Sequence, residues 1–262
     1  MASLQAESIA NSLAFPMVLK AALELGVIDT ISAAGKDTWL SPSEIAVRLP
    51  SKPSNPEAPM LLDRMMRQLA SHSILKCRVV ETGENNRTGK IERVYAAEPV
   101  CKFFLKNSDE TGSFFSLFML VQGDIVFKAW THLKNVILEG RDGFSSAHGM
   151  RLFEYIGLDE PYGDLFNRAM SESSIIIMNK VLEVYKGFED VNILVDVGGG
   201  LGTVLGLITS KYPHIEGINF DLPHVLAHAH PYSGIKHVAG DMFTEVPKGD
   251  VILMKVSYVY FI

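Results

Sequence analysis

The chain has 262 residues, enough for one large domain or, as we expect here, two. Its formal net charge of −6 argues against a nucleic-acid partner, which would need a basic surface. Two cysteines make no disulfide framework, no uncharged apolar run is long enough to span a membrane, and no secretory signal opens the sequence. We therefore expect a cytoplasmic protein with no nucleic acid and no membrane among its partners.

The first residues predict helices. Apolar side chains recur at helical spacing over residues 2–34, and Pro16 is expected to break or kink this pattern at Phe15. Further on, Ser41 is followed by a proline suited to the first helical position and by Glu44 three residues later. This spacing predicts a capping box at the start of another helix.

A further helix and a hairpin complete this part of the chain. Residues 59–72 carry apolar side chains on one helical face, and residues 76–82 and 91–96 predict two strands joined by a polar tip. Helices followed by a hairpin are typical of a winged helix. Because acidic and basic residues balance here and no helix is rich in Lys or Arg, we interpret residues 1–110 as a scaffold or dimerisation module rather than a DNA reader.

The middle of the chain, residues 111–190, is expected to be helical. A long stretch over 113–139 is apolar on more than one face, as expected of a helix buried against a partner subunit or between domains. Residues 140–150 predict a loop, and two further helices are predicted over 151–156 and 162–185.

From residue 191 onward, predicted strands and helices alternate. The strand 191–197 runs into the turn Asp196-Val-Gly-Gly-Gly-Leu-Gly202, and a helix follows. This order opens a nucleotide-type α/β domain, because Gly198, Gly200 and Gly202 let the backbone turn tightly and approach a ligand. The remaining predicted elements are helices over 203–211 and 223–230 and strands over 215–221, 236–240 and 250–257.

Acidic residues follow two neighbouring strands of this predicted sheet. Asp221 ends the second strand, about 20 residues past the glycines, where an acid reaches the hydroxyls of a ribose. Asp241 and Met242 follow the third strand and can accept from an exocyclic amine and pack on a purine. Taken alone, Asp221 could merely cap the next helix. The combination favours a nucleoside, and Thr203 breaks the dinucleotide motif, so S-adenosylmethionine fits better than NAD.

Longer stretches of the sequence carry a family resemblance. They are Phe15–Leu25 and Ala58–Met66 in the first part and Leu194–Gly202, Gly217–Val225, His237–Phe243 and Val246–Lys255 in the last. Together they resemble the plant caffeic-acid-type O-methyltransferases, which use S-adenosylmethionine, and the first part is most similar to the indole glucosinolate O-methyltransferases among them. The resemblance covers nearly the whole chain and implies that residues 1–110 form a dimerisation domain.

The resemblance also implies which residues hold the cofactor. Gly198, Asp221, Asp241, Met242 and Lys255 stand at the family's cofactor positions. Asp221 is implied to hold the ribose hydroxyls, Asp241 and Met242 the adenine, and Lys255 to lie near the far side of the cofactor. No metal ligand is implied.

The resemblance places the pocket for an aromatic acceptor at Phe166 and Met170. At Val121 some relatives carry Asn, and at Ile156 and Ser173 some carry His. These departures leave the identity of the acceptor open.

The family's general base, a histidine, has no counterpart in this sequence, because Val259 stands at its position and Tyr260 at that of the following aspartate. Loss of a positioned general base typically costs ~10²–10⁴ in rate. The family continues beyond the point at which this sequence stops. The resemblance therefore implies a C-terminally truncated enzyme form with impaired activity and no catalytic residue of its own.

The expected fold is α/β. It combines an N-terminal helical, winged-helix-like dimerisation domain (1–110), a helical linker and acceptor-pocket segment (111–190), and an incomplete Rossmann-like class I methyltransferase domain (191–262). The expected activity is S-adenosylmethionine-dependent methylation of a small aromatic hydroxyl of phenylpropanoid, flavonoid or indole type in plant secondary metabolism. The expected partner is a second copy or a full-length relative. The alternatives are a non-catalytic dimerisation partner and an NAD-dependent dehydrogenase.

Overall fold

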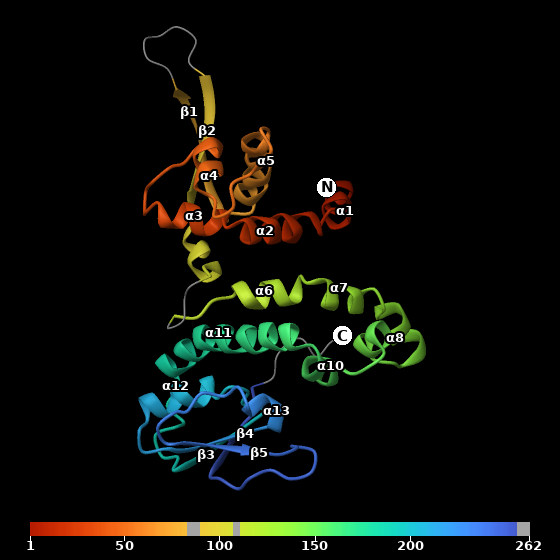
Figure 1. Ribbon diagram of the computed structural model, residues 1–262, viewed down its shortest axis with the longest axis vertical. Coiled ribbons are helices and arrows are strands. Elements are labelled where there is room, and N and C mark those ends of the chain that lie inside the picture. The colour runs from red at the N-terminus through yellow and green to blue at the C-terminus, as the bar shows by residue number, and fades with distance from the viewer. Residues whose placement is uncertain (83–89, 107–110, 256–262) are drawn as a thin grey trace. The chain divides into compact units, whose positions relative to one another are not determined.

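The computed structural model describes residues 1–82, 90–106 and 111–255. The chain divides into two compact units, Met1–Asn107 and Ser108–Ile262 (Figure 1). The second unit holds both the helical middle segment and the sheet. The three-part division predicted from the sequence, with boundaries at 110 and 190, therefore stays a prediction.

The first unit combines helices with one hairpin. Its elements are α1 (Ala2–Ala10), α2 (Ala14–Leu25), α3 (Val27–Ala33), α4 (Pro42–Arg48), α5 (Ala58–Ser71), β1 (Leu75–Thr82), β2 (Lys90–Ala97) and the 3₁₀ helix η1 (Pro99–Phe104). The predicted break at Phe15 is wrong, because the chain breaks between Ala10 and Ala14 instead. Pro16 lies in the first turn of α2, where its missing N–H is not needed.

The capping box of α4 is confirmed. Ser41 Oγ accepts a hydrogen bond from the Glu44 backbone N–H at 3.2 Å, and Glu44 Oε2 accepts one from the Ser41 N–H at 2.8 Å. The hydrogen bond from the Ser41 backbone lowers the pKa of Glu44 below its ordinary value. The local sequence alone therefore fixes where this helix begins.

The hairpin is anchored to the helices by Tyr95. β1 and β2 pair antiparallel from Leu75↔Ala97 onward, and the predicted polar tip over 83–89 lies outside the described residues. The buried Tyr95 donates its hydroxyl to Asp63 Oδ1 of α5 at 2.8 Å. Its pKa is raised by burial and by this bond, so the hydroxyl stays a donor.

The second unit begins with a helical segment. Its helices are α6 (Phe115–Val121), α7 (Asp124–Trp130), α8 (Leu133–Glu139), α9 (Gly143–His148), α10 (Leu152–Leu158) and α11 (Glu160–Val184). The apolar stretch 113–139 thus forms three helices rather than one, and the extended backbone of Gly123 separates the first two. The predicted loop 140–150 is also wrong in part, because Asp142 caps α9 by accepting from the Ser145 N–H at 2.8 Å.

A parallel sheet follows these helices in the second unit. Its elements are β3 (Ile193–Val197), α12 (Thr203–Lys211), β4 (Glu216–Asp221), α13 (Pro223–Leu226), β5 (Ile235–Ala239) and β6 (Val251–Leu253). The strand order is β5-β4-β3-β6, so β3 has a partner on each side. Helix α13 and strand β6 are shorter than predicted, and the predicted strand beyond Lys255 falls on residues that the structure does not describe.

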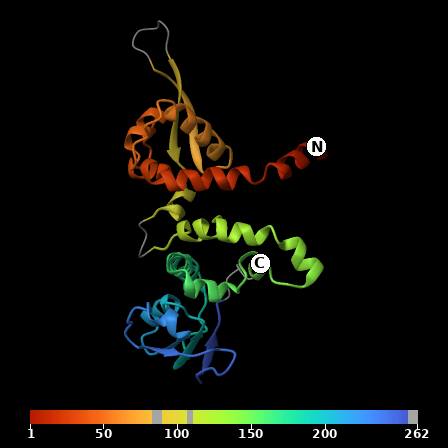
Figure 2. The same cartoon turned by 45° about the vertical axis from the view of Figure 1, so that its right-hand side comes forward.

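Helix α11 links the helical segment to the sheet. It packs against α6 on one side and against α12 on the other (Figures 1 and 2). Apolar side chains of α11, α12 and β3 form one core, which includes Met178, Leu194 and Leu205. The other face of the sheet packs around Val195 and Phe220. Ser171 Oγ in the middle of α11 lies 2.6 Å from Thr203 Oγ1 at the start of α12, so α11 passes close to the carboxyl end of β3.

The described helices are too short or too polar to span a membrane singly. Helices α1 and α2, bent by 41° at their break, meet the length and composition criteria only when taken together.

Candidate functional site

The glycine turn follows β3 at the carboxyl edge of the sheet. Gly198, Gly200 and Gly202 have φ angles of +71°, +60° and +83°, the left-handed region that favours glycine. A β-carbon at Gly198 or Gly200 would meet no atom within 4 Å. These two glycines therefore border open space, in which a ligand can approach the backbone.

Gly199 is required for a different reason. A β-carbon there would lie 2.1 Å from Asn219 Oδ1 and 2.8 Å from Asp196 Oδ2. Glycine is needed at this position because the buried side chains of Asn219 and Asp196 leave no room for a β-carbon. The sequence prediction singled out neither Gly199 nor Asn219, since no local signal marks a contact between β3 and β4.

Asp221 ties the end of β4 to the glycine turn. Its Oδ2 accepts from the Gly200 N–H at 2.8 Å, and its Oδ1 accepts from the Leu222 N–H at 2.7 Å. It does not cap α13, whose N-cap is Leu222 without a side-chain cap. The structure thus brings Asp221 beside Gly200 and leaves further lone pairs on the carboxylate.

Asn219 and His237 support the turn from neighbouring strands. The Asn219 side-chain nitrogen lies 3.0 Å from the Gly200 carbonyl oxygen and 3.0 Å from His237 Nδ1. His237 Nε2 in turn lies 2.9 Å from the carbonyl oxygen of His230. This chain of bonds links β4 and β5 to the glycine turn.

Asp196 and Lys255 add two ionisable groups at the same edge. Asp196 is 1% exposed. Burial and the nearby Asp221 raise its pKa to about 7, although Lys255 opposes the shift. Burial also lowers the pKa of the half-buried Lys255, and Asp196 opposes that change.

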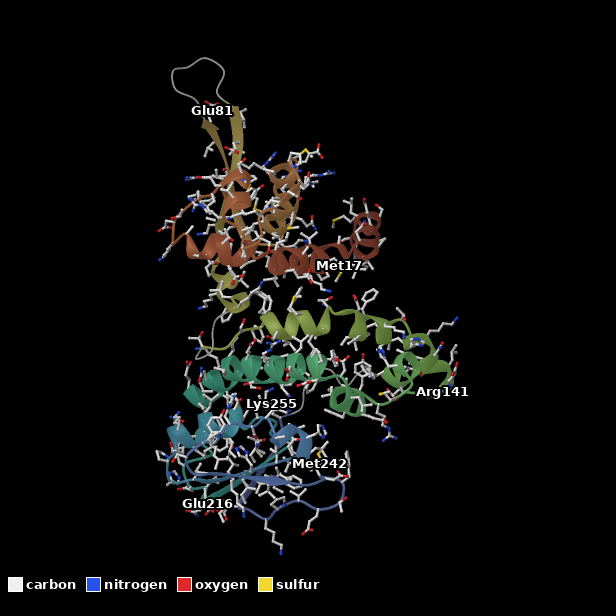
Figure 3. All side chains as sticks on the ribbon, viewed as in Figure 1. Met17, Glu81, Arg141, Glu216, Met242 and Lys255 are labelled. Carbon is white, nitrogen blue, oxygen red and sulfur yellow. The ribbon has the colours of Figure 1, made fainter. Side chains whose placement is uncertain are left out.

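Asp241 and Met242 lie in the loop after β5 and are both exposed (Figure 3 labels Met242 and Lys255). Asp241 Oδ1 accepts from the Phe243 N–H at 2.9 Å. In the described part of the chain no hydrogen bond joins either residue to the glycine turn. Their link to the site is a hydrogen bond of the backbone. The N–H of Gly240, the residue before Asp241, donates to the Asp221 carbonyl oxygen at 3.0 Å.

The predicted acceptor residues lie on α11. Phe166 and Met170 are partly buried and pack against a cluster around Leu120, Ile156 and Tyr162. The Tyr162 hydroxyl is buried without a hydrogen-bond partner, and burial raises its pKa to about 12. The same cluster includes Tyr155, whose hydroxyl donates to Asp159 Oδ2 at 3.2 Å. The sequence prediction singled out neither tyrosine.

A cavity of about 370 Å³ opens beside the segment that follows Asp221. It lies between α10, α11 and α13, and its polar lining includes Glu160, Asp164, Asn167, His224 and His228. The volume suits a small molecule. Among the described residues, no group of three or more His, Cys, Asp or Glu side chains is placed to hold a metal ion.

Two family models match the sequence. One describes an O-methyltransferase dimerisation domain and matches residues 7–107, and the other describes an O-methyltransferase domain and matches residues 130–260. The chain is 54% identical over 256 residues to indole glucosinolate O-methyltransferase 4 of Arabidopsis thaliana, covering 96% of this chain and 66% of that protein. It is 50% identical over 254 residues to caffeic acid 3-O-methyltransferase of Eucalyptus gunnii, covering 97% and 68%. The chain thus spans about two thirds of the length of these relatives.

Solved structures of similar fold include human N-acetylserotonin methyltransferase in complex with SAM. That likeness has a TM-score of 0.76 at 22% identity and covers 97% of this chain and 70% of the other. A methyltransferase of calicheamicin biosynthesis in its SAH-bound form has a TM-score of 0.72 at 20% identity, with 96% and 69% covered. At such identities the likeness establishes the fold. The predicted α/β class, a helical dimerisation domain joined to a parallel-sheet methyltransferase domain, is confirmed.

Proposed function

Since the chain belongs to the O-methyltransferase family, we propose that it binds S-adenosylmethionine at the glycine turn and serves methyl transfer to a hydroxyl of a small aromatic acceptor. The observation that carries this proposal is the hydrogen bond from Gly200 to Asp221. It fixes a carboxylate beside an open glycine turn, at the edge where parallel α/β sheets bind ligands.

The residues present suit this cofactor. Each Asp221 oxygen accepts one backbone N–H, which leaves lone pairs for two ribose hydroxyls. The space beside Gly198 and Gly200 is open to the ligand. Exposed Asp241 and Met242 supply an acceptor and a polarisable surface for an adenine, and half-buried Lys255 completes the proposed set.

When bound, the cofactor supplies an electrophilic methyl group to the oxygen of the acceptor. The role of this chain's own residues is to orient the two reactants. Phe166 and Met170 offer an apolar wall that suits an aromatic ring, and the acceptors we propose are phenylpropanoid, flavonoid or indole hydroxyls. The buried Tyr162 hydroxyl, which has no hydrogen-bond partner, lies in the cluster against which these two side chains pack.

The binding step is tested by calorimetric titration of the chain with S-adenosylhomocysteine. We expect saturable binding that Asp221→Asn weakens, and no comparable binding of NAD. The matched control is Asp190→Asn, an exposed acid that precedes β3. Equal binding of NAD, or no binding of S-adenosylhomocysteine, would contradict the proposal.

We propose that turnover by this chain is slow, because Val259, at the position of the family's general base, cannot accept a proton. Val259 lies outside the described residues. A phenol has a pKa of ~10, so few acceptor molecules are ionised at neutral pH. In assays with labelled cofactor and a panel of phenols and hydroxyindoles, Val259→His should raise the rate by ~10²–10⁴, whereas Val259→Leu should not. Equal rates in all three chains would contradict this.

The second candidate is a non-catalytic partner that pairs with longer relatives. The match of residues 7–107 to a dimerisation domain favours it, as do the exposed apolar side chains of Ile9 and Leu13. Co-expression with a full-length relative, followed by size-exclusion chromatography, should give a mixed dimer. Separate elution of the two chains would count against this candidate.

A cytoplasmic location also belongs to the proposal. Cys77 and Cys101 are free thiols, as suits a reducing compartment. A fluorescent fusion expressed in plant cells should show diffuse cytoplasmic signal. Accumulation in the secretory pathway would contradict it.

A further inference from the structure

Two buried oxygens beneath the glycine turn have no hydrogen-bond partner. Asp196 and Asn219 are register partners on β3 and β4, so their side chains lie on the same face of the sheet. Asp196 is 1% exposed and Asn219 is fully buried, and neither Asp196 Oδ2 nor Asn219 Oδ1 is paired. Both oxygens approach the point where a β-carbon on Gly199 would lie, at 2.8 and 2.1 Å respectively.

The other contacts of the Asn219 amide fix its orientation. The nitrogen faces the Gly200 carbonyl oxygen and His237 Nδ1. His237 carries its ring proton on Nε2, which faces the His230 carbonyl oxygen, so Nδ1 is an acceptor. The amide nitrogen therefore donates both bonds, and Oδ1 must point the other way. Reversing the amide would set an oxygen against the Gly200 carbonyl.

The free oxygen of Asn219 thus needs a donor, and Asp196 is the polar side chain beside it. An ionised carboxylate has only acceptors and would leave two buried acceptors unpaired, which is costly. A protonated Asp196 supplies the missing donor. Burial and the negative charge of Asp221 favour the protonated form of Asp196, and the positive charge of Lys255 opposes it. Together they raise the pKa of Asp196 to about 7. His237 stands on the far side of Asn219.

We infer that Asp196 is a positioning residue that carries a proton in the free chain, donates it to Asn219 Oδ1, and releases it when the cationic cofactor binds. The inference rests on the proposed function, because the sulfonium and ammonium groups of S-adenosylmethionine bring positive charge to the edge where Asp196, Asp221 and Lys255 interact. Positive charge favours the ionised form of a carboxyl group. The O–H bond of Asp196 breaks, the oxygen keeps the electron pair, and the proton passes to the solvent.

The first measurement uses the chain without ligand. A carboxyl whose pKa is raised in the folded state holds a proton that the unfolded chain has already lost. Its contribution to thermal stability therefore falls from about pH 4 to about pH 7 and then levels off. Asp196→Asn should lack this fall, because its amide donates to Asn219 Oδ1 at every pH. The exposed control Asp190→Asn should keep it. Parallel melting profiles for wild type and Asp196→Asn would overturn the inference.

The second measurement is calorimetric titration with S-adenosylmethionine in buffers of different ionisation heat. Wild type should release about half a proton between about pH 6 and pH 7, and its affinity should rise about tenfold in total between acid and about pH 8. Asp196→Asn should bind without this release. Any proton that the ligand itself exchanges is the same for both chains, so the difference between them reports Asp196 alone. The variant should match wild type in acid and bind about tenfold more weakly at about pH 8, a difference of one pKa unit. Adenosine, which lacks both cationic groups, should release no proton from wild type.

The outcomes separate this inference from the proposed function. Binding with equal proton release in wild type and Asp196→Asn overturns the inference and leaves the cofactor site standing. Absence of binding by wild type at every pH overturns the proposed function and the coupling together. The ligand-free melting profiles still decide in that case whether Asp196 holds the proton.

Discussion

At the residue scale, the glycine turn contains glycines of two kinds. Gly200 is needed for its backbone conformation, since its φ is +60° and the space beside it is open. Gly199 is needed for space, since a β-carbon would lie 2.1 Å from Asn219 Oδ1. The two glycines are adjacent, but alanine meets buried side chains at Gly199 and open space at Gly200. Comparing the two alanine variants therefore distinguishes an effect on ligand binding from an effect on the stability of the fold.

We expect Gly199→Ala to lower the free energy of unfolding by about 1–3 kcal/mol, because the methyl group displaces buried Asn219 and Asp196. Gly200→Ala should cost about 1–2 kcal/mol through its left-handed backbone alone. The methyl group of Gly200→Ala projects into the open space beside the turn. For the same loss of stability, this variant should therefore lose more affinity for S-adenosylhomocysteine than Gly199→Ala does. Urea unfolding and calorimetric titration of both variants check this. If the two variants lost the same affinity for each kcal/mol of stability lost, the prediction would be contradicted.

At the element scale, Asp250 joins the starts of two strands. Its Oδ2 accepts from the backbone N–H groups of Asn192 and Ile193 at 3.0 and 2.8 Å, and its own N–H donates to the Ile193 carbonyl oxygen at 2.9 Å. These bonds precede β3 and β6 and set the register in which the strands pair. The N–H groups of Ile193 and Asn192 lower the pKa of Asp250.

The lowered pKa gives Asp250 a pH dependence of the opposite sign to that of Asp196. Its stabilising contribution is present above about pH 4, the ordinary range of an Asp, and is lost as the pH falls through the lowered value. Asp250→Asn should therefore melt at a lower temperature than wild type near neutral pH, and the difference should shrink in acid. Thermal melts across this range, with Asp190→Asn as control, test the prediction. A difference that grows in acid would be incompatible with it.

At the scale of the whole molecule, the first unit leaves apolar side chains uncovered. Ile9 on α1 is 67% exposed, and Leu13, just before α2, is also exposed. We propose that these side chains belong to an interaction surface, because residues 7–107 match a dimerisation domain. A second copy of the chain is the partner that this match favours.

We therefore expect the chain to elute as a dimer and Ile9→Glu to shift it toward monomer, because a buried charge opposes association. Val79→Glu is the matched control, since Val79 of β1 is similarly exposed but lies on the hairpin. Size-exclusion chromatography with light scattering over a range of concentrations measures the effect. Equal weakening by both substitutions would contradict an interface at α1.

Signals that act within a few residues were predictable from the sequence. The capping box at Ser41, the strands of the parallel sheet and the glycine turn after β3 all depend on local spacing. Two errors were also local. Pro16 was expected to break a helix that it helps to begin, and the cap at Asp142 was overlooked.

By itself, then, the sequence determined the family, the order of the elements and the acid that meets the glycine turn, because each depends on short-range spacing or on long motifs. The tertiary structure alone decided that Asn219 and Asp196 face each other beneath Gly199, with His237 holding the amide in place. These residues come from three strands that are distant in sequence. The contact depends on which residues of separate strands stand side by side and on burial, which raises the cost of an unpaired acceptor. Long-range packing of the sheet decides both.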